Sequence, residues 1–131
     1  MNLVLDTSVL IWALTDSPRL GVGARALIRS GASVVYVSAA SCWEIAIKVA
    51  LGRLEIGGQP DRILPAAFEV SNYQVLAISM EHALRAGALP RHHRDPFDRM
   101  LIAQAQMEGL QIVTADRRFS EYKVPTIDPT Q

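Results

Sequence analysis

The stretch Arg94-Asp95-Pro96-Phe97-Asp98-Arg99-Met100-Leu101-Ile102-Ala103-Gln104-Ala105 places two carboxylates at the start of a strongly apolar segment. Asp95 before Pro96 predicts a helix start, because Asp caps free N–H groups and Pro loses no hydrogen bond at the first helical position. Residues 100–105 are almost all apolar, so we expect this helix to be largely buried. Asp98 then lies one turn inside it, where its negative charge either is stabilised by the helix dipole or holds a cation.

The composition favours an ordered globular chain without a disulfide framework. Half of the 131 residues are hydrophobic and one fifth are charged, and no low-complexity tract is present. This length predicts one domain spanning residues 1–131. Cys42 is the single cysteine, which excludes an internal disulfide and a multi-cysteine zinc site and is compatible with a reducing cytosol.

The amino-terminal segment and the charge balance restrict where the protein acts. Residues 1–6 have no basic segment and reach a charge at Asp6, unlike a secretion signal, and no apolar run is long enough to span a bilayer. We therefore expect a cytoplasmic protein without a membrane partner. The 13 basic and 13 acidic residues cancel, so a polyanion would have to bind a local patch rather than a wholly cationic surface.

Apolar runs that alternate with helical patterns predict a parallel sheet. We expect strands at residues 3–5, 34–37, 74–78 and 111–114, with at most an edge strand in the tail from residue 124 to 131. Helices are expected at residues 9–14, 22–29, 39–51 and 61–69, from Ser79 to Gly87, and from Pro96 to Gly109. The predicted fold class is therefore a three-layer α/β/α sandwich with a central, mostly parallel sheet and right-handed crossovers.

Acidic residues gather at one edge of this predicted sheet. Asp6 follows the first strand and Asp116 the fourth, and open parallel sheets bind ligands beyond the carboxyl ends of their strands. The helices that carry Glu44, Asp95 and Asp98 start on the same side. Ionised carboxylates in one cleft repel each other by about 4 kcal/mol per close pair at an effective dielectric near 20, so the cluster needs a cation. Oxygen ligands favour Mg²⁺ or Mn²⁺ over Zn²⁺.

Each of these acids also has a purely structural interpretation. Asp95 can be a helix cap and Asp98 a first-turn acid favoured by the helix dipole. Glu44 and Lys48 are spaced as an i,i+4 pair on a solvent-facing side. The positions around Glu44 are too apolar for a solvent face, however, which favours a polar pocket for its carboxylate.

Three histidines and a glycine motif are interpreted as having no part in a functional site. His92 and His93 belong to a basic loop and are expected to be solvated, and His82 in the first turn of its helix is expected at the surface. Gly21-Val22-Gly23-Ala24-Arg25-Ala26 matches a G-x-G-x-x-A string. A dinucleotide-binding loop must follow a strand directly, and residues 17–20 do not form one, so we interpret this match as accidental.

Arginines lie beside the acids along the chain. They are Arg91, Arg94, Arg99, Arg117 and Arg118. A pocket for a cation alone has no use for them, whereas guanidinium groups suit phosphates. Carboxylates that hold metal ions, together with arginines that hold neighbouring phosphates, indicate hydrolysis of nucleic-acid phosphodiester bonds by metal-activated water.

Four motifs in order resemble the PIN-domain family, and most closely its VapC-type toxins. They are Val4-Leu5-Asp6-Thr7-Ser8, Trp43-Glu44-Ile45-Ala46-Ile47-Lys48 with Gly52-Arg53-Leu54, the stretch 94–105, and Thr114-Ala115-Asp116. The resemblance covers nearly the whole chain. It implies a PIN-like fold and a Mg²⁺- or Mn²⁺-dependent endoribonuclease, usually a homodimer, held inactive by a cognate VapB-like, DNA-binding antitoxin.

The resemblance also implies roles for individual residues. The family's acidic quartet, which would supply both the catalytic groups and the metal ligands, falls on Asp6, Glu44, Asp98 and Asp116. Asp95 would be an accessory acid. Thr7, Ser8 and Thr114 would be supporting polar groups.

The alternative is a non-catalytic module of similar α/β fold, either a Mg²⁺-binding signalling domain or a scaffold that only binds an antitoxin. A receiver domain needs adjacent acids after its first strand, but Thr7 follows Asp6, and it needs an Asp after its third strand, where Ser79 stands. A phosphatase with a D-x-D pair is excluded by Ser8. A scaffold contradicts no sequence feature but leaves the complete acidic set unexplained.

Overall fold

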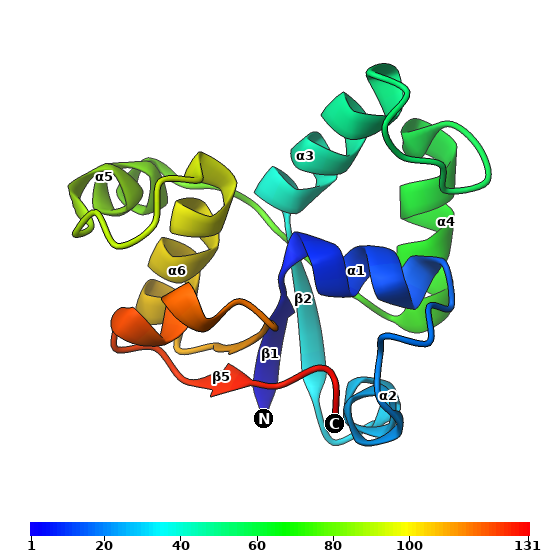
Figure 1. Cartoon of the computed structure of the whole chain (residues 1–131), viewed down its shortest axis with the longest axis horizontal. Helices are drawn as coiled ribbons and strands as arrows, with labels where there is room; N and C mark the ends of the chain where they lie inside the picture. The colour runs from blue at the N-terminus through cyan, green and yellow to red at the C-terminus, as the bar shows by residue number, and fades with distance from the viewer.

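Five parallel strands form the central sheet of the computed structural model, which describes residues 1–131 (Figure 1). In the spatial order β3-β2-β1-β4-β5 they span Gln74–Leu76, Val34–Ser38, Asn2–Leu5, Gln111–Val113 and Thr126–Ile127. β1 pairs in parallel with β2 on one side and with β4 on the other, so it occupies the centre. The predicted parallel sheet is confirmed, with a third strand two residues shorter than expected and a short edge strand in the tail.

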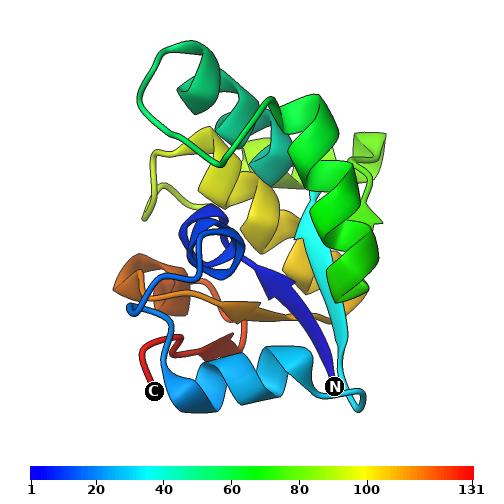
Figure 2. The ribbon, with the colours of Figure 1, turned by 90° about the vertical axis from the view of Figure 1, so that its right-hand side faces the viewer.

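Helices cover both faces of this sheet. They are α1 (Thr7–Leu14), α2 (Val22–Arg29), α3 (Ala39–Ala50), α4 (Pro60–Ser71), α5 (Met80–Ala88), α6 (Pro96–Glu108) and the 3₁₀ helix η1 (Arg117–Glu121). Figure 1 shows α5 and α6 on one side of the strands and α1, α2 and α4 on the other, and Figure 2 shows the same layers after a quarter turn. No helix combines the length and the apolar character needed to cross a membrane.

The central strand is buried on both of its faces. Leu3 and Leu5 pack into a core cluster with residues of α1 to α4, whereas Val4 packs into a second cluster with residues of α5, α6 and η1. Successive side chains of a strand point to opposite faces, so a strand covered on both sides must be apolar throughout. The two core clusters confirm the three-layer sandwich.

α5 begins after Ser79, its predicted cap, but departs from the sequence prediction at its carboxyl end and in the burial of His82. It continues through Gly87 to Ala88. His82, which we expected at the surface, is buried. Its Nδ1 accepts the backbone N–H of Ser79 (3.0 Å), and its Nε2 lies 2.8 Å from Oε1 of Glu108 on α6. His82 therefore completes the cap of α5 and ties this helix to α6.

The loop between α5 and α6, residues 89–95, is held by two side chains from outside it. The hydroxyl of Tyr122 donates to the carbonyl of Pro90 (2.6 Å) and accepts the backbone N–H of His93 (2.7 Å). The guanidinium of Arg99 donates to the carbonyls of Leu89 (2.9 Å) and Pro90 (3.1 Å). These bonds fix the chain that leads into α6.

The glycines of the G-x-G-x-x-A string accommodate the end of the chain. The N–H of Gly21 donates to the carbonyl of Pro129 (2.8 Å), and the N–H of Gly23 donates to the carbonyl of Gln131 (2.9 Å). A Cβ atom at Gly21 would lie 2.5 Å from the carbonyl oxygen of Thr130. The absence of side chains thus lets residues 129–131 pack against the start of α2, and the string has a structural role.

Gly21→Ala should lower the free energy of unfolding by about 1–3 kcal/mol, because the added methyl group meets backbone atoms that cannot rotate away. The φ angle of Gly21 is −68°, so backbone strain does not contribute. Gly31→Ala is the matched control: a Cβ there meets no atom within 4 Å, and the change should be neutral or stabilise by about 0.4–1 kcal/mol. Urea-induced unfolding measures both, and equal stabilities would contradict the prediction.

Candidate active site

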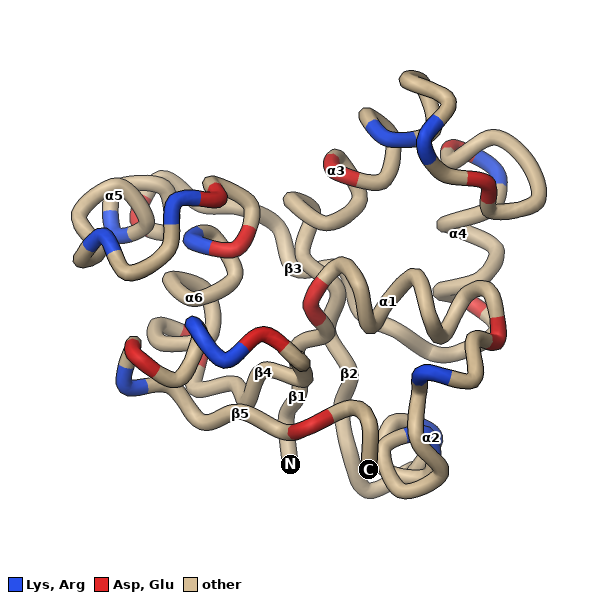
Figure 3. The backbone as a smooth tube through the Cα atoms, in the orientation of Figure 1, with Lys and Arg blue, Asp and Glu red and all other residues tan.

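A cleft of about 420 Å³ opens at the carboxyl edge of the sheet, where α1 and α6 begin and α3 passes. It is lined by Asp6, Thr7, Ser8, Trp12, Glu44, Lys48, Asp95, Asp98, Ala115, Asp116 and Arg118. Figure 3 shows acidic positions at the starts of α1 and α6 and on α3 around this region. All five acids singled out from the sequence therefore share one cleft.

Asp6 is the most deeply buried of these acids, with 6% of its surface exposed. It caps α1, because its Oδ1 accepts the N–H of Val9 (2.8 Å), and its Oδ2 accepts the hydroxyl of Thr114 (2.5 Å). Burial raises the pKa of Asp6; the two hydrogen bonds lower it, and the charges of Asp116 and Glu44 raise it further. The supporting role expected of Thr114 corresponds to this bond. Thr7, also buried, donates to the hydroxyl of Ser41 (3.0 Å).

Asp95 and Asp98 lie together at the start of α6. Oδ1 of Asp95 accepts the N–H groups of Phe97 (2.8 Å) and Asp98 (3.3 Å), which confirms the predicted cap. Burial raises the pKa of Asp98 to about 7, and the charges of Asp95, Asp6, Glu44 and Asp116 add to the effect. The mutual repulsion expected of the clustered carboxylates therefore contributes, after burial, to the raised pKa of Asp98.

Glu44 makes the predicted pair with Lys48, but its carboxylate lies in the cleft and not on a solvent-facing side. Its Oε2 lies 3.2 Å from Nζ of Lys48 one turn later, yet only 13% of its side chain is exposed and it lines the cleft. Its Oε1 is buried without a hydrogen-bond partner. Leaving such an atom unsatisfied costs about 1–3 kcal/mol or more. An unpartnered carboxylate oxygen among other carboxylates fits a hard divalent cation as ligand.

Asp116 differs from Asp98 because a cation accompanies it. Arg118 donates from Nε to Oδ1 (3.1 Å) and from Nη2 to Oδ2 (2.9 Å). These bonds lower the pKa of Asp116 to about 2. The hydroxyl of Thr114, which binds Asp6, also accepts the N–H of Asp116 (3.0 Å). Asp116 is thus ionised at neutral pH and fixed relative to Asp6.

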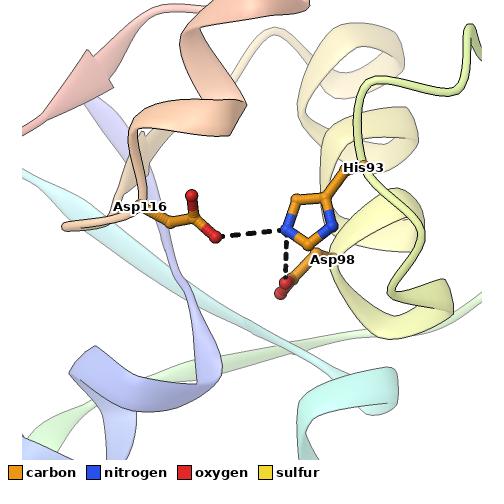
Figure 4. Close-up of side chains that lie close together, drawn as sticks. All are labelled: His93, Asp98 and Asp116. Carbon is orange, nitrogen blue, oxygen red and sulfur yellow. Dashed lines mark hydrogen bonds and ion pairs between the residues drawn. The ribbon is translucent and has the colours of Figure 1, made fainter.

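His93 is the site residue that sequence reasoning missed. We expected it in a solvated loop, but it is only 2% exposed, whereas the neighbouring His92 is exposed. Its Nε2 lies 2.9 Å from Oδ2 of Asp98 and 3.1 Å from Oδ2 of Asp116 (Figure 4). The one local signal was its place two residues before the capping Asp95, whose N–H its Nδ1 accepts (3.2 Å).

The five arginines have different surroundings. Arg118 lines the cleft, Arg91 and Arg94 are exposed in a hollow beside the 89–95 loop, and Arg117 is exposed in a third hollow. Arg99 instead donates to backbone carbonyls of residues 86, 87, 89, 90 and 93. Because these bonds occupy its guanidinium, we assign Arg99 to holding the loop rather than to binding RNA.

A comparison with protein families decides the relationship of the chain. The model of the PIN domain matches residues 3–125. The chain belongs to the PIN-domain family. Members of this family are generally nucleases, so the acidic cleft of this PIN domain lies in a fold associated with phosphodiester chemistry. No curated protein sequence matches it significantly.

Several solved structures share the fold of this PIN domain. A chain of VapBC2 from Rickettsia felis, bound to a DNA fragment from the promoter, is 15% identical, with 97% of this chain and 98% of that chain covered and a TM-score of 0.72. FitAcB from Neisseria gonorrhoeae is 22% identical, with 97% of each chain covered and a TM-score of 0.70. VapBC-1 from nontypeable Haemophilus influenzae is 17% identical, with 100% of each chain covered and a TM-score of 0.65. These similarities confirm the PIN-like sandwich.

Without metal ions, this PIN domain should become less stable as the pH rises from 5 to 8. Folding raises the pKa of Asp98 from 3.8 to about 7. The stabilisation by protonated Asp98 is therefore complete below pH 3.8 and is lost as the pH rises through 7. Asp116, with a pKa near 2, stays ionised throughout and adds no slope.

Asp98→Asn supplies the comparison, because its amide is neutral at every pH. With allowance for solvent screening, it should reduce the loss of unfolding free energy between pH 5 and 8 by at least ~1 kcal/mol. Urea titrations in EDTA at the two pH values measure this. Parallel pH profiles for the wild type and the variant would show that Asp98 does not titrate in this range.

Proposed function

We propose that this PIN domain is a metal-dependent endoribonuclease and the toxin of a toxin–antitoxin pair. One observation carries the proposal: four carboxylates from separate segments, those of Asp6, Glu44, Asp98 and Asp116, line one cleft. Their charge is incompletely balanced, as the raised pKa of Asp98 and the unpartnered Oε1 of Glu44 indicate. An all-oxygen ligand set with excess negative charge suits Mg²⁺ or Mn²⁺.

The four acids would hold the cation, and other residues of the chain would bind and orient the RNA. A cation held there would supply a nucleophile by lowering the pKa of water and would offset the charge of the scissile phosphate. Arg118 lies in the cleft and presents a guanidinium beside the acids. The exposed Arg91, Arg94 and Arg117 would contact neighbouring phosphates of the strand. Asp95 would add negative charge beside Asp98 while it caps α6, and Ser8 would offer a hydroxyl at the cleft wall.

Asp98→Asn should reduce RNA cleavage by at least ~100-fold with the fold intact, because the amide removes a charge that balances the cation. Glu44→Gln should likewise weaken Mn²⁺ binding in calorimetry and stop cleavage. Asp61→Asn is the matched control: Asp61 also lies in a helix first turn behind a Pro, but outside the cleft, and its loss should leave both properties unchanged.

The outcomes of this experiment separate the alternatives. An Asp98→Asn variant that cuts RNA at the wild-type rate in Mg²⁺ would refute the assignment of Asp98. A wild-type chain that binds Mn²⁺ in the cleft but cleaves no RNA would favour the non-catalytic Mg²⁺-binding module instead.

The proposed partner is a VapB-like, DNA-binding antitoxin that acts on a homodimer in the cytoplasm. The similar structures support it, since they come from VapBC and FitAB complexes, two of which are bound to DNA fragments. A free ribonuclease would harm its own cell, so the partner should block the cleft. An inserted Arg suits this purpose, because its planar fork can engage two carboxylates. Trp12, which is half-buried at the cleft, can contribute an aromatic contact.

A short gene beside this one should encode that antitoxin, with an Arg among hydrophobic residues in its carboxyl-terminal segment. Co-expression should restore growth, and replacing that Arg by Ala should restore nuclease activity even where the complex still forms. Growth assays and RNA cleavage by the purified complexes measure these effects. If the acids of the complex remain accessible to Mn²⁺ and RNA, inhibition does not operate by blocking the cleft.

A further inference from the structure

We propose that His93 is a positioning residue of the acidic cleft, which donates a hydrogen bond from Nε2 and orients Asp98 and Asp116 without binding the metal ion itself. This inference rests on the proposed function, because it assumes that these two acids are ligands. Figure 4 shows one nitrogen of the imidazole ring facing two carboxylates, one from α6 and one from the segment after β4.

The hydrogen bonds of the ring determine which nitrogen carries its hydrogen. Nδ1 accepts the backbone N–H of Asp95 at 3.2 Å, so its lone pair faces a donor and the hydrogen lies on Nε2. Nε2 donates to Oδ2 of Asp116 at 3.1 Å, and Oδ2 of Asp98 lies 2.9 Å away.

This tautomer excludes Nε2 as a metal ligand. His93, Asp98 and Asp116 bring possible ligand atoms within 4.8 Å of one another, which taken alone suggests a three-ligand site. A ligating imidazole nitrogen must offer its lone pair to the metal, however. Nε2 has no lone pair free while Nδ1 accepts the Asp95 N–H. The ring therefore acts as a donor to Oδ2 of Asp116, and Oδ2 of Asp98 lies against the same N–H.

The ring is held firmly enough to orient its neighbours. The backbone N–H of His93 donates to the hydroxyl of Tyr122 (2.7 Å), and its carbonyl accepts Nη1 of Arg99 (3.2 Å). Its edge packs against Phe119, with ring centroids 5.7 Å apart and an interplanar angle of 85°. One fixed donor therefore brings carboxylate oxygens from two separate segments to a common point. Such partners of metal ligands typically contribute 10- to 100-fold to metal affinity or activity.

Calorimetric titration with Mn²⁺ tests the role of His93 in three variants. His93→Leu, which has no donor, should weaken Mn²⁺ binding by about 10- to 100-fold. His93→Gln, which places an amide donor near the position of Nε2, should restore part of that affinity. His92→Leu is the matched control: His92 is an exposed neighbour that lies 3.5 Å from Glu121 rather than near the cleft acids, and its replacement should have no effect. The KM for RNA should stay constant in all three variants while kcat at limiting Mn²⁺ falls only in the His93 variants.

The outcomes distinguish this inference from the proposed function. A wild-type chain that neither binds Mn²⁺ nor cleaves RNA overturns both. A wild-type chain that does both, together with a folded His93→Leu variant of equal Mn²⁺ affinity, overturns only the role of His93. Long-range ¹H–¹⁵N spectra of the wild type need no variant: an Nε2–H tautomer with and without Mg²⁺ supports the proposal, and an unprotonated Nε2 that shifts on Mg²⁺ addition identifies a ligand and overturns it.

Discussion

The burial of the Asp6 carboxylate at the end of the central strand constrains the rest of this PIN domain. A charge removed from water is tolerated only where hydrogen bonds replace the water. Asp6 obtains them from Val9 at the start of α1 and from Thr114 after β4. These two bonds require the β1–α1 turn and the end of β4 to meet at one point. Because Thr114 also binds the N–H of Asp116, the same network places a second acid beside the first.

The negative charges of the cleft are compensated unequally, so one side of the cleft is more acidic than the other. Asp116 forms an ion pair with Arg118, and one carboxylate oxygen of Glu44 forms an ion pair with Lys48. Asp6 has only neutral donors. Asp98 has only His93 as a nearby donor, and burial, together with the charges of four other acids, raises its pKa. Close carboxylate pairs cost about 4 kcal/mol each at an effective dielectric near 20. The negative charge of the cleft is therefore least compensated at Asp6, Asp98 and the unpartnered oxygen of Glu44, whereas Arg118 compensates Asp116.

The sequence predicted what local signals encode and missed what distant partners decide. The Asp95-Pro96 pair located the start of α6, and the apolar run of β1 located the central strand, because caps and periodicity act over a few residues. His82 and His93 were assigned to the solvent because some of their partners, Glu108 for His82 and Asp116 and Tyr122 for His93, are distant in sequence. Arg99 was predicted to bind phosphate because it lies beside the acids in sequence, but proximity in sequence does not show which donors the fold already uses.

The stretch from Arg94 to Ala105 supplies two acids of the cleft and also part of the support that holds them. Asp98 faces the cleft, while Arg99, the next residue along α6, turns to the carbonyls of the preceding loop. One of those carbonyls belongs to His93, whose ring returns to Asp98. Asp98, Arg99 and His93 are thus linked to one another by contacts at the start of α6. A site on such a rigid element keeps its geometry better than one on a free loop, so residues outside the acidic quartet determine how accurately its carboxylates converge.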